Sequence, residues 1–293
     1  MDWALRYSIH VGYAPPQRLL LFRASAGSDR AEHVRFAARM GFAGVLFPWA
    51  AESPAEERHR VRAALAETGL QCGSIVFTPV MDPVWVVEGR DAQDRMLGHL
   101  ADALAIAREF GSDNLAVLIR GDGHTALAVQ RRRAIDQLRV AADVAAANGI
   151  VLAIEPMVSF PDMLLRNFSE SVELVRAAAH PAIKLIFDTG HLTRMGDPLL
   201  STYVEAYDDI HVLQLADMPG RVEIGAGEID FVPLLAHAMS RGYRGLVDLE
   251  HDWLEPGEAA ERRAIDKLSA IDALARRRAF GALAMHESQG KPP

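Results

Sequence analysis

Short apolar runs alternate with longer stretches in which apolar residues recur at helical spacing, and this alternation continues along the whole chain. The short runs have the length of buried strands, and each is followed by a stretch long enough for a helix. The pattern predicts strands at residues 5–11, 43–47, 71–77, 114–119, 150–155, 183–187, 210–215 and 245–250.

Helices are expected between these strands, and several of their ends carry local signals. Ser53 and Pro54 suit the N-cap and the first helical position, and Glu56 completes a capping box. Glycines follow five of the helical stretches, where a left-handed C-terminal cap is common. The predicted helices are 29–40, 54–68, 92–110, 125–148, 169–179, 199–207, 231–241 and 257–279.

Alternating strands and helices of this number, within 293 residues, predict a (β/α)₈ TIM barrel of the α/β class. A doubly wound sheet is the alternative, but no Gly-x-Gly-x-x-Gly follows the first strand, and no phosphate-binding loop is visible. No linker or break in composition divides the chain. We therefore expect a single barrel domain over residues 1–280, and a flexible tail over 281–293 because its end is polar.

The composition is that of an ordinary globular protein, with 50% hydrophobic and 24% charged residues. The net charge of −8 argues against general affinity for nucleic acid or anionic membranes, although it leaves a local basic patch open. Cys72 is the only cysteine, so no intrachain disulfide and no thiolate metal cage is expected. No signal pattern and no apolar run of membrane-spanning length is visible, and a cytoplasmic location is expected.

Four oxygen-bearing side chains stand near the ends of predicted strands: Glu155, Asp188, Gln214 and Glu250. The carboxyl ends of parallel barrel strands converge on one face, so these distant residues are expected to meet there. Three carboxylates and a carboxamide form a hard oxygen site suited to Mg²⁺ or Mn²⁺. The two glutamates could also move protons, which indicates an enzyme.

Each of these positions also has a structural interpretation. Glu155 could face solvent or cap the next helix, although a glutamate that closes an apolar strand is costly to bury unpaired. Asp188 precedes Thr189 and Gly190, a sequence that favours an Asx turn. His191 could be a metal ligand, a donor to a substrate oxygen, or a loop histidine.

Strand alternation decides between rival residues in the last two strands. His211 and Gln214 are three apart and so face opposite sides, which makes His211 a structural residue if Gln214 points into the barrel mouth. Asp248 and Glu250 share a face, and Glu250 is preferred because it is closer to the catalytic rim.

Polar residues outside the quartet are weaker candidates. Arg221, in the loop after the seventh strand, could bind a substrate carboxylate or hydroxyl, or could be a solvated loop residue. Asp217 is a candidate supporting acid, and His10 is interpreted as an ordinary half-buried histidine. Aromatic residues in 47–49 and 84–85 could wall a pocket or fill a subunit interface.

The second half of the chain resembles the xylose isomerase-like TIM-barrel superfamily, particularly its hydroxypyruvate isomerase and ketose 3-epimerase branch. The resemblance covers Gly149 to Glu250, and its segments occur in the expected order. They are Ile154-Glu155-Pro156, Phe187-Asp188-Thr189-Gly190-His191, Gln214-Leu215-Ala216-Asp217-Met218-Pro219-Gly220-Arg221, Gly225-Ala226-Gly227-Glu228-Ile229-Asp230-Phe231, Gly242-Tyr243-Arg244-Gly245 and Leu249-Glu250.

The resemblance implies that the quartet binds one divalent metal and that Glu155 and Glu250 are the acid/base pair. It also implies that His191 and Arg221 contact the substrate. Homodimers or homotetramers are common among the proteins that this chain resembles, and the oligomeric state stays open. Three departures indicate an altered substrate pocket. Val158 stands in place of an asparagine, Val45-Leu46-Phe47 in place of a strand-end glutamate, and Val212 in place of a histidine.

The expected function is that of a divalent-metal-dependent isomerase or epimerase of a small sugar or α-hydroxy carbonyl compound. Chelation of the carbonyl and its neighbouring hydroxyl acidifies the C–H bond between them, and a glutamate moves the proton through an enediolate. A lyase of the inosose dehydratase type is the runner-up, because loss of a β-hydroxyl can follow the same intermediate. A DNA-repair endonuclease and a non-catalytic subunit are further alternatives.

Overall fold

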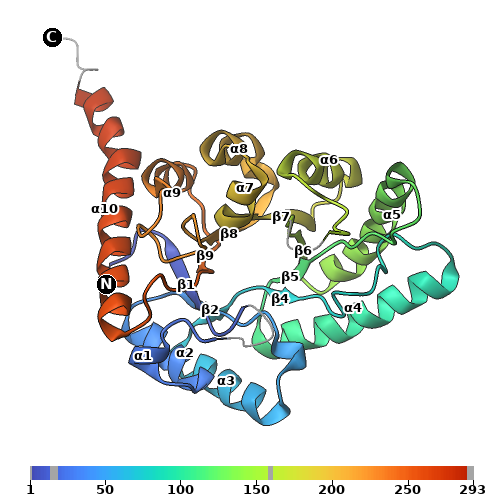
Figure 1. The fold of residues 1–293 in the computed structure, drawn as a ribbon, viewed down its shortest axis with the longest axis horizontal. Helices are drawn as coiled ribbons and strands as arrows, with labels where there is room; N and C mark the ends of the chain where they lie inside the picture. The colour runs from blue at the N-terminus through green and yellow to red at the C-terminus, as the bar shows by residue number, and fades with distance from the viewer. Residues whose placement is uncertain (1, 14–18, 158–160, 289–293) are drawn as a thin grey trace.

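The computed structural model describes residues 2–13, 19–157 and 161–288, and the strands form one parallel sheet that curls into a barrel (Figure 1). The order across the sheet is β3-β2-β1-β9-β8-β7-β6-β5-β4. The (β/α)₈ prediction is confirmed. The strands are β1 (Arg6–His10), β2 (Gly44–Leu46), β3 (Gln71–Cys72), β4 (Ile75–Val76), β5 (Asn114–Val117), β6 (Val151–Ile154), β7 (Ile183–Asp188), β8 (Ile210–Leu215) and β9 (Leu246–Leu249).

The predicted strand 71–77 is divided into two short strands, which is why the sheet has nine strands rather than eight. Its first part, β3, pairs with β2, and its second part, β4, pairs with β5. The amide of Val76 also donates to the carbonyl of Pro48 at 2.8 Å, and that of Phe77 donates to Ala116 at 2.9 Å. Residues 71–77 therefore change partners along their length and join the two sides of the barrel.

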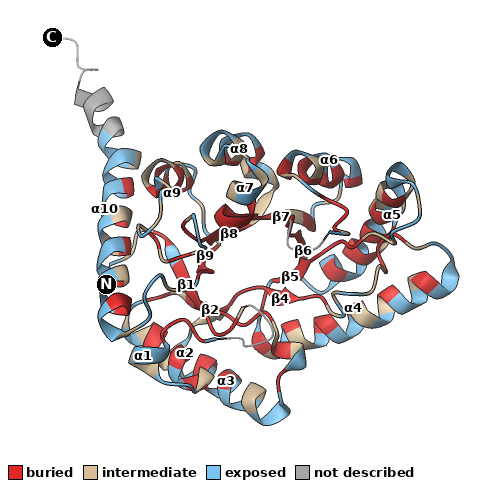
Figure 2. Ribbon diagram, in the orientation of Figure 1, coloured by how far each residue is buried: buried red, intermediate tan, exposed pale blue. Residues whose placement is uncertain are grey.

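Helices surround the strands and bury the side that faces them (Figures 1 and 2). In α4 the residues Met96, Leu100 and Leu104 recur every fourth position and are buried against the sheet. The helices are α1 (Arg23–Ala26), α2 (Arg30–Arg39), α3 (Ala55–Thr68), α4 (Arg90–Phe110), α5 (Leu127–Ala147), α6 (Phe168–Ala178), α7 (Thr189–Met195), α8 (Leu199–Ala206), α9 (Phe231–Ser240) and α10 (Glu258–Ser288), with 3₁₀ turns η1 (Ala50–Glu52) and η2 (Tyr207–Asp209).

Three helices differ from the prediction, and the first is the short α1 (Arg23–Ala26), which precedes the first predicted helix. The segment after Asp188, expected to be a loop, forms α7, because the Asp188 carboxylate accepts a hydrogen bond from the amide of His191 at 2.8 Å and caps the helix. The last helix, α10, continues to Ser288 instead of ending near 279. The proposed flexible tail over 281–293 lies partly outside the described residues and stays a prediction. Within the described part of the chain, no helix is long and apolar enough to cross a membrane.

The barrel interior is filled in layers by alternate strand residues. One apolar layer includes Val76, Ala116, Ala153, Ile186 and Val212, all buried. The next inward-facing positions along β6, β7 and β8 lie closer to the carboxyl ends of the strands. Those positions are polar, and they form the candidate site.

Candidate active site

The quartet named from the sequence occupies adjacent strand ends on one face of the barrel. Glu155 follows β6, Asp188 ends β7, Gln214 lies in β8 opposite Asp188, and Glu250 follows β9. All are buried, with exposed fractions of 7%, 1%, 3% and 8% in that order. Glu155, Gln214 and Glu250 line a cavity of about 360 Å³ at the barrel mouth, together with His191. The expected convergence therefore occurs.

Arg221 lies between two of these carboxylates. Its Nη1 donates to Asp188 Oδ1 at 3.1 Å, and its Nη2 donates to Asp188 Oδ2 at 2.7 Å and to Glu250 Oε1 at 3.0 Å. The side chain is 15% exposed, so these are largely desolvated ion pairs. Arg221 is thus part of the site rather than a solvated loop residue.

Asp217 positions the loop that carries Arg221. Its carboxylate accepts hydrogen bonds from the amides of Met218, Gly225, Gly227 and Ile229 at 2.8–3.0 Å. Its exposed fraction is 0%, and it does not line the cavity. Asp217 therefore supports the site through the backbone of the loop.

Glu155, Asp188 and His191 form the tightest group of possible ligands, with one donor atom from each lying within 4.8 Å of the others. His191 Nε2 lies 3.5 Å from Glu155 Oε1. Glu250 faces the same cavity, but it is joined to Asp188 through Arg221. His191 is therefore as well placed to bind a metal as the predicted ligands Glu155 and Asp188.

The donor set fits a divalent cation. Among the described residues, Gln214 Oε1 and His191 Nδ1 are buried and have no hydrogen-bond partner. A buried acceptor without a partner is costly, and a cation would satisfy the carboxamide oxygen. Three carboxylates share the site with a single buried guanidinium, which leaves excess negative charge for a hard ion.

Burial favours the protonated forms of the two glutamates when no cation compensates their charge. Burial, followed by the charge of Asp188, raises the pKa of Glu155 to about 8. Burial also raises the pKa of Glu250 well above its ordinary value, although Arg221 opposes the shift. Glu155 can therefore exchange a proton near neutral pH, as a general acid or base requires, and the pKa of Glu250 shifts in the same direction.

The pKa values of Asp188 and His191 are lowered rather than raised. Burial disfavours the ionised form of Asp188, but Arg221 and His191 outweigh that effect and the pKa of Asp188 is lowered. Burial lowers the pKa of His191 to about 4, despite the opposing charge of Asp188. An ionised aspartate and a neutral imidazole are the forms in which these residues bind metals or substrate oxygens.

Asp248, the alternative to Glu250, does not line the cavity. Asp248 sits one layer below Glu250, where it has an exposed fraction of 0% and accepts a hydrogen bond from the Ser8 hydroxyl. Burial raises the pKa of Asp248 to about 6, while hydrogen bonds from Ser8 and Gln214 oppose the shift.

The two other histidines are structural. His211 lies near the start of β8 and off the cavity wall, with Nε2 3.5 Å from Asp113 Oδ1. An irregularity in the pairing of β7 with β8 falls at His211, so alternation alone does not fix its side. His10 is buried and hydrogen-bonds the carbonyl of His251 at 2.9 Å. Neither ring lines the cavity.

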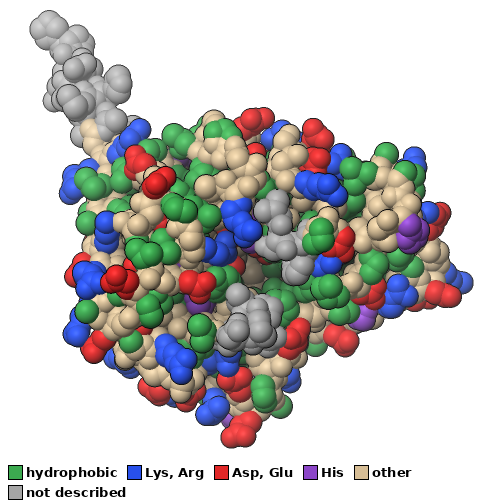
Figure 3. Space-filling model, in the orientation of Figure 1, with side chains coloured by type: hydrophobic (Ala, Val, Ile, Leu, Met, Phe, Trp, Pro, Cys, Tyr) green, Lys and Arg blue, Asp and Glu red, His purple; other side chains and the backbone are tan. Residues whose placement is uncertain are grey.

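The opposite wall of the cavity is apolar, a feature that the sequence interpretation missed. Pro48 and Trp49 belong to it, so this aromatic segment walls a pocket, whereas Trp85 is buried against Phe77. Hydrophobic and basic side chains gather around the middle of this face of the barrel (Figure 3). The apolar lining residues are Leu46, Pro48, Trp49, Val76, Val80, Ala116, Leu118 and Met157. Val158, another predicted departure, lies outside the described residues.

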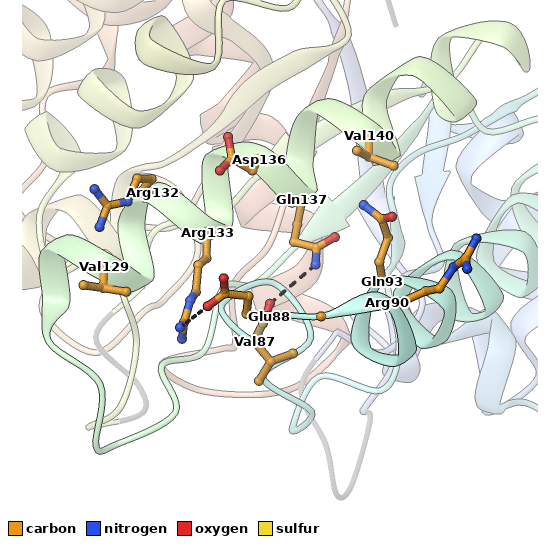
Figure 4. A pocket seen from close by; sticks show the side chains of 11 residues that line it. Val87, Glu88, Arg90, Gln93, Val129, Arg132, Arg133, Asp136, Gln137 and Val140 are labelled. Carbon is orange, nitrogen blue, oxygen red and sulfur yellow. Dashed lines mark hydrogen bonds and ion pairs between the residues drawn. The ribbon is translucent and has the colours of Figure 1, made fainter.

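A second hollow lies between α4 and α5 in the outer helical layer (Figure 4). Within it Arg133 pairs with Glu88, and Gln137 donates to the carbonyl of Val87 at 3.4 Å. None of the converging carboxylates reaches it. The barrel-mouth cavity is therefore the better candidate for chemistry.

Comparison with known families identifies the kind of barrel. The model of the xylose isomerase-like TIM barrel family matches residues 34–271. The chain belongs to this family. The match spans most of the chain and extends well beyond the segment in which the resemblance was recognised from sequence.

Two curated members and one solved structure illustrate the family. The chain is 27% identical over 235 residues to hydroxypyruvate isomerase of Escherichia coli (strain K12), covering 73% of this chain and 84% of that protein. It is 27% identical over 206 residues to 3-dehydroshikimate dehydratase of Pseudomonas putida (strain KT2440), covering 65% of this chain but 31% of that protein. An L-ribulose 3-epimerase structure superposes with a TM-score of 0.74 at 21% identity, covering 98% of this chain and 100% of that one. Homologues with these names support an enzyme of the sugar isomerase and epimerase class.

Proposed function

We propose that this family member is a divalent-metal-dependent isomerase or epimerase of a small α-hydroxy carbonyl compound, with hydroxypyruvate as the first substrate to test. The observation that carries the proposal is the pair of buried glutamates, Glu155 and Glu250, facing one cavity with raised pKa values. Hydroxypyruvate isomerase of Escherichia coli is the relative whose name supports this choice.

The residues suit proton transfer between adjacent carbons. An ionised glutamate accepts a proton from the carbon between the carbonyl and the hydroxyl, and the second, protonated glutamate returns one at the neighbouring carbon or the opposite face. Arg221 stays between Asp188 and Glu250 and limits the charge that builds up there. The place where the proton returns decides between isomerisation and epimerisation.

Glu155, Asp188, Gln214 and Glu250, with His191 beside them, would hold the metal. A bound Mg²⁺ or Mn²⁺ would supply positive charge that favours the ionised glutamates and stabilises negative charge developing on the substrate oxygens. His191 and Arg221 would contact the substrate as hydrogen-bond donors. The apolar wall opposite them excludes water from the proton being transferred.

A lyase acting through the same proton abstraction is the second candidate. The related Pseudomonas putida protein is named as a dehydratase. In such a reaction the protonated glutamate would donate to the departing β-hydroxyl, which leaves as water, instead of returning a proton to carbon.

The proposal is tested by metal analysis followed by NMR of hydroxypyruvate, ketoses and inososes in D₂O. We expect bound divalent metal and metal-dependent deuterium incorporation that is lost in Glu155→Gln and in Glu250→Gln. Glu255→Gln is the matched control, because this exposed glutamate lies in the loop after β9. A protein that bound no divalent ion and exchanged no proton of any of these compounds would refute the proposal.

A further inference from the structure

Two arginines line the barrel-mouth cavity, and they differ in how far they are engaged. Arg221 is committed to Asp188 and Glu250 by three hydrogen bonds. Arg194 is exposed, and within the described ranges no carboxylate or carbonyl pairs with its guanidinium. Among the described residues, Arg194 is therefore the guanidinium of this cavity that is available to an incoming anion.

Arg194 is placed at the rim by the start of α7. Because Asp188 caps this helix, His191 and Arg194 lie three residues apart on neighbouring positions of one face. Both side chains line the cavity. The charge of Arg194 also helps to lower the pKa of His191, which shows that the guanidinium is within electrostatic reach of the imidazole.

In the described part of the cavity wall, no other cationic side chain is left without a partner. One side is apolar, from Leu46 through Met157, and the deep polar side presents the carboxyl groups of Glu155 and Glu250. A carboxylate against either surface would be desolvated without a partner or repelled. At Arg194 it would meet a planar fork of donors that matches its two oxygens.

We propose that Arg194 binds the carboxylate of the substrate, so that the enzyme acts on small hydroxy-oxo acids in preference to neutral sugars. The carboxylate lies at the rim beside His191, and the carbons that exchange a proton face Glu155 and Glu250. This inference rests on the proposed function, because it assigns the orientation of a substrate in that site. Arg194 then selects the substrate, while the glutamates transform it.

Binding of unreactive probes tests this assignment without turnover. D-glycerate and glycerol differ in that a carboxylate replaces a hydroxymethyl group. We expect wild-type protein to bind glycerate more tightly than glycerol by calorimetry, both with Mg²⁺ and after chelation. Arg194→Gln should weaken glycerate binding roughly tenfold or more without changing glycerol binding, and Arg194→Lys should restore part of it. Arg166→Gln removes the same charge from an exposed position off the cavity wall and should change neither.

Turnover gives the second readout, with hydroxypyruvate and its neutral counterpart dihydroxyacetone compared in D₂O. Arg194→Gln should raise KM for hydroxypyruvate and leave kcat and the exchange of dihydroxyacetone unchanged. If neither compound exchanged but glycerate binding still required Arg194, the proposed reaction would fail and the carboxylate site would stand. Absence of glycerate binding by the wild-type protein, or equal binding by Arg194→Gln, would overturn the inference.

Discussion

Arg221 Nη2 donates to Asp188 Oδ2 at 2.7 Å, and the same nitrogen lies 3.0 Å from Glu250 Oε1. One guanidinium thus compensates two buried carboxyl groups from different strands. This contact explains how the protein holds its acidic residues together at the barrel mouth. It also makes Arg221 a determinant of stability.

Arg221→Gln should destabilise the protein, because it leaves Asp188 buried without its counter-charge. Removing one partner of a buried ion pair costs about 3–5 kcal/mol. Mg²⁺ or Mn²⁺ should recover part of this loss, since a cation replaces the missing positive charge. The free energy of unfolding in urea, with and without metal, measures both effects.

Arg176→Gln is the matched control for that experiment, because Arg176 pairs with Asp209 on the surface with a side chain that is 51% exposed. Surface pairs contribute about 0–1 kcal/mol, so this variant should unfold like the wild type and show no added response to metal. Equal stability of Arg221→Gln and the wild type would show that the buried pairs do not hold the site together.

In the metal-free protein, the contribution of Glu155 to the unfolding free energy should fall as the pH rises from about 4.5 to about 8. The folded state keeps a proton on Glu155, whose pKa is raised from 4.5 to about 8, while the unfolded state has already released it. The stability linked to this proton is fully present below the unfolded pKa and lost as the pH approaches the folded one. Glu250, whose pKa is also raised, contributes in the same direction.

Glu155→Gln removes one of these protons and should flatten the decline in the unfolding free energy measured across this pH window in chelator. Added Mg²⁺ should oppose the decline in the wild type, because the ion favours the ionised carboxylate. Glu255→Gln, in an exposed position, should follow the wild-type curve. Parallel curves for the wild type and Glu155→Gln would contradict the assignment of a buried, protonated Glu155.

Much of this site could be predicted from sequence because strand geometry is regular. Alternation favoured Gln214 over His211, and Gln214 lines the cavity whereas His211, which pairs with Asp113, does not. The preference for Glu250 over Asp248 followed from the same regularity and from depth in the barrel. Asp248 indeed lies one layer below the cavity wall.

Other features could not be inferred from local pattern. An aspartate before Thr-Gly looks the same whether it begins a turn or caps a helix, so the seven-residue helix α7 was missed and Arg194 with it. The apolar wall was missed for a different reason. Val76 and Leu118 look like ordinary core residues in the sequence. An apolar side chain that points into the barrel gives the same sequence pattern whether it packs in the core or lines the cavity.

Asp217→Asn should detach the loop that carries Arg221. The carboxylate accepts four backbone hydrogen bonds through two oxygens, and the amide nitrogen of asparagine would face the amides of Gly225 and Gly227 or those of Met218 and Ile229. An unsatisfied buried group costs about 1–3 kcal/mol, so stability should fall by at least this much. Limited proteolysis within the loop should accelerate.

Glu228→Gln provides a control in the same loop, because Glu228 is exposed and its change removes one charge. Its proteolysis rate and unfolding free energy should match those of the wild type. If Asp217→Asn were as resistant to proteolysis as this control, the four hydrogen bonds would not be what fixes the position of Arg221.

Gln214→Ala should weaken metal binding without unfolding the barrel. The Gln214 carboxamide oxygen is a buried acceptor that no group in the described structure satisfies, and the side chain lines the cavity. Outer supports of metal ligands already contribute roughly 10- to 100-fold in affinity, so loss of a direct oxygen donor should cost at least as much. Calorimetric titration of Mn²⁺ measures the change. His211→Ala changes the same strand at a residue that does not line the cavity, so this variant should bind Mn²⁺ like the wild type. Equal Mn²⁺ affinity in Gln214→Ala and His211→Ala would remove Gln214 from the metal site and leave the cation to Glu155, Asp188 and His191.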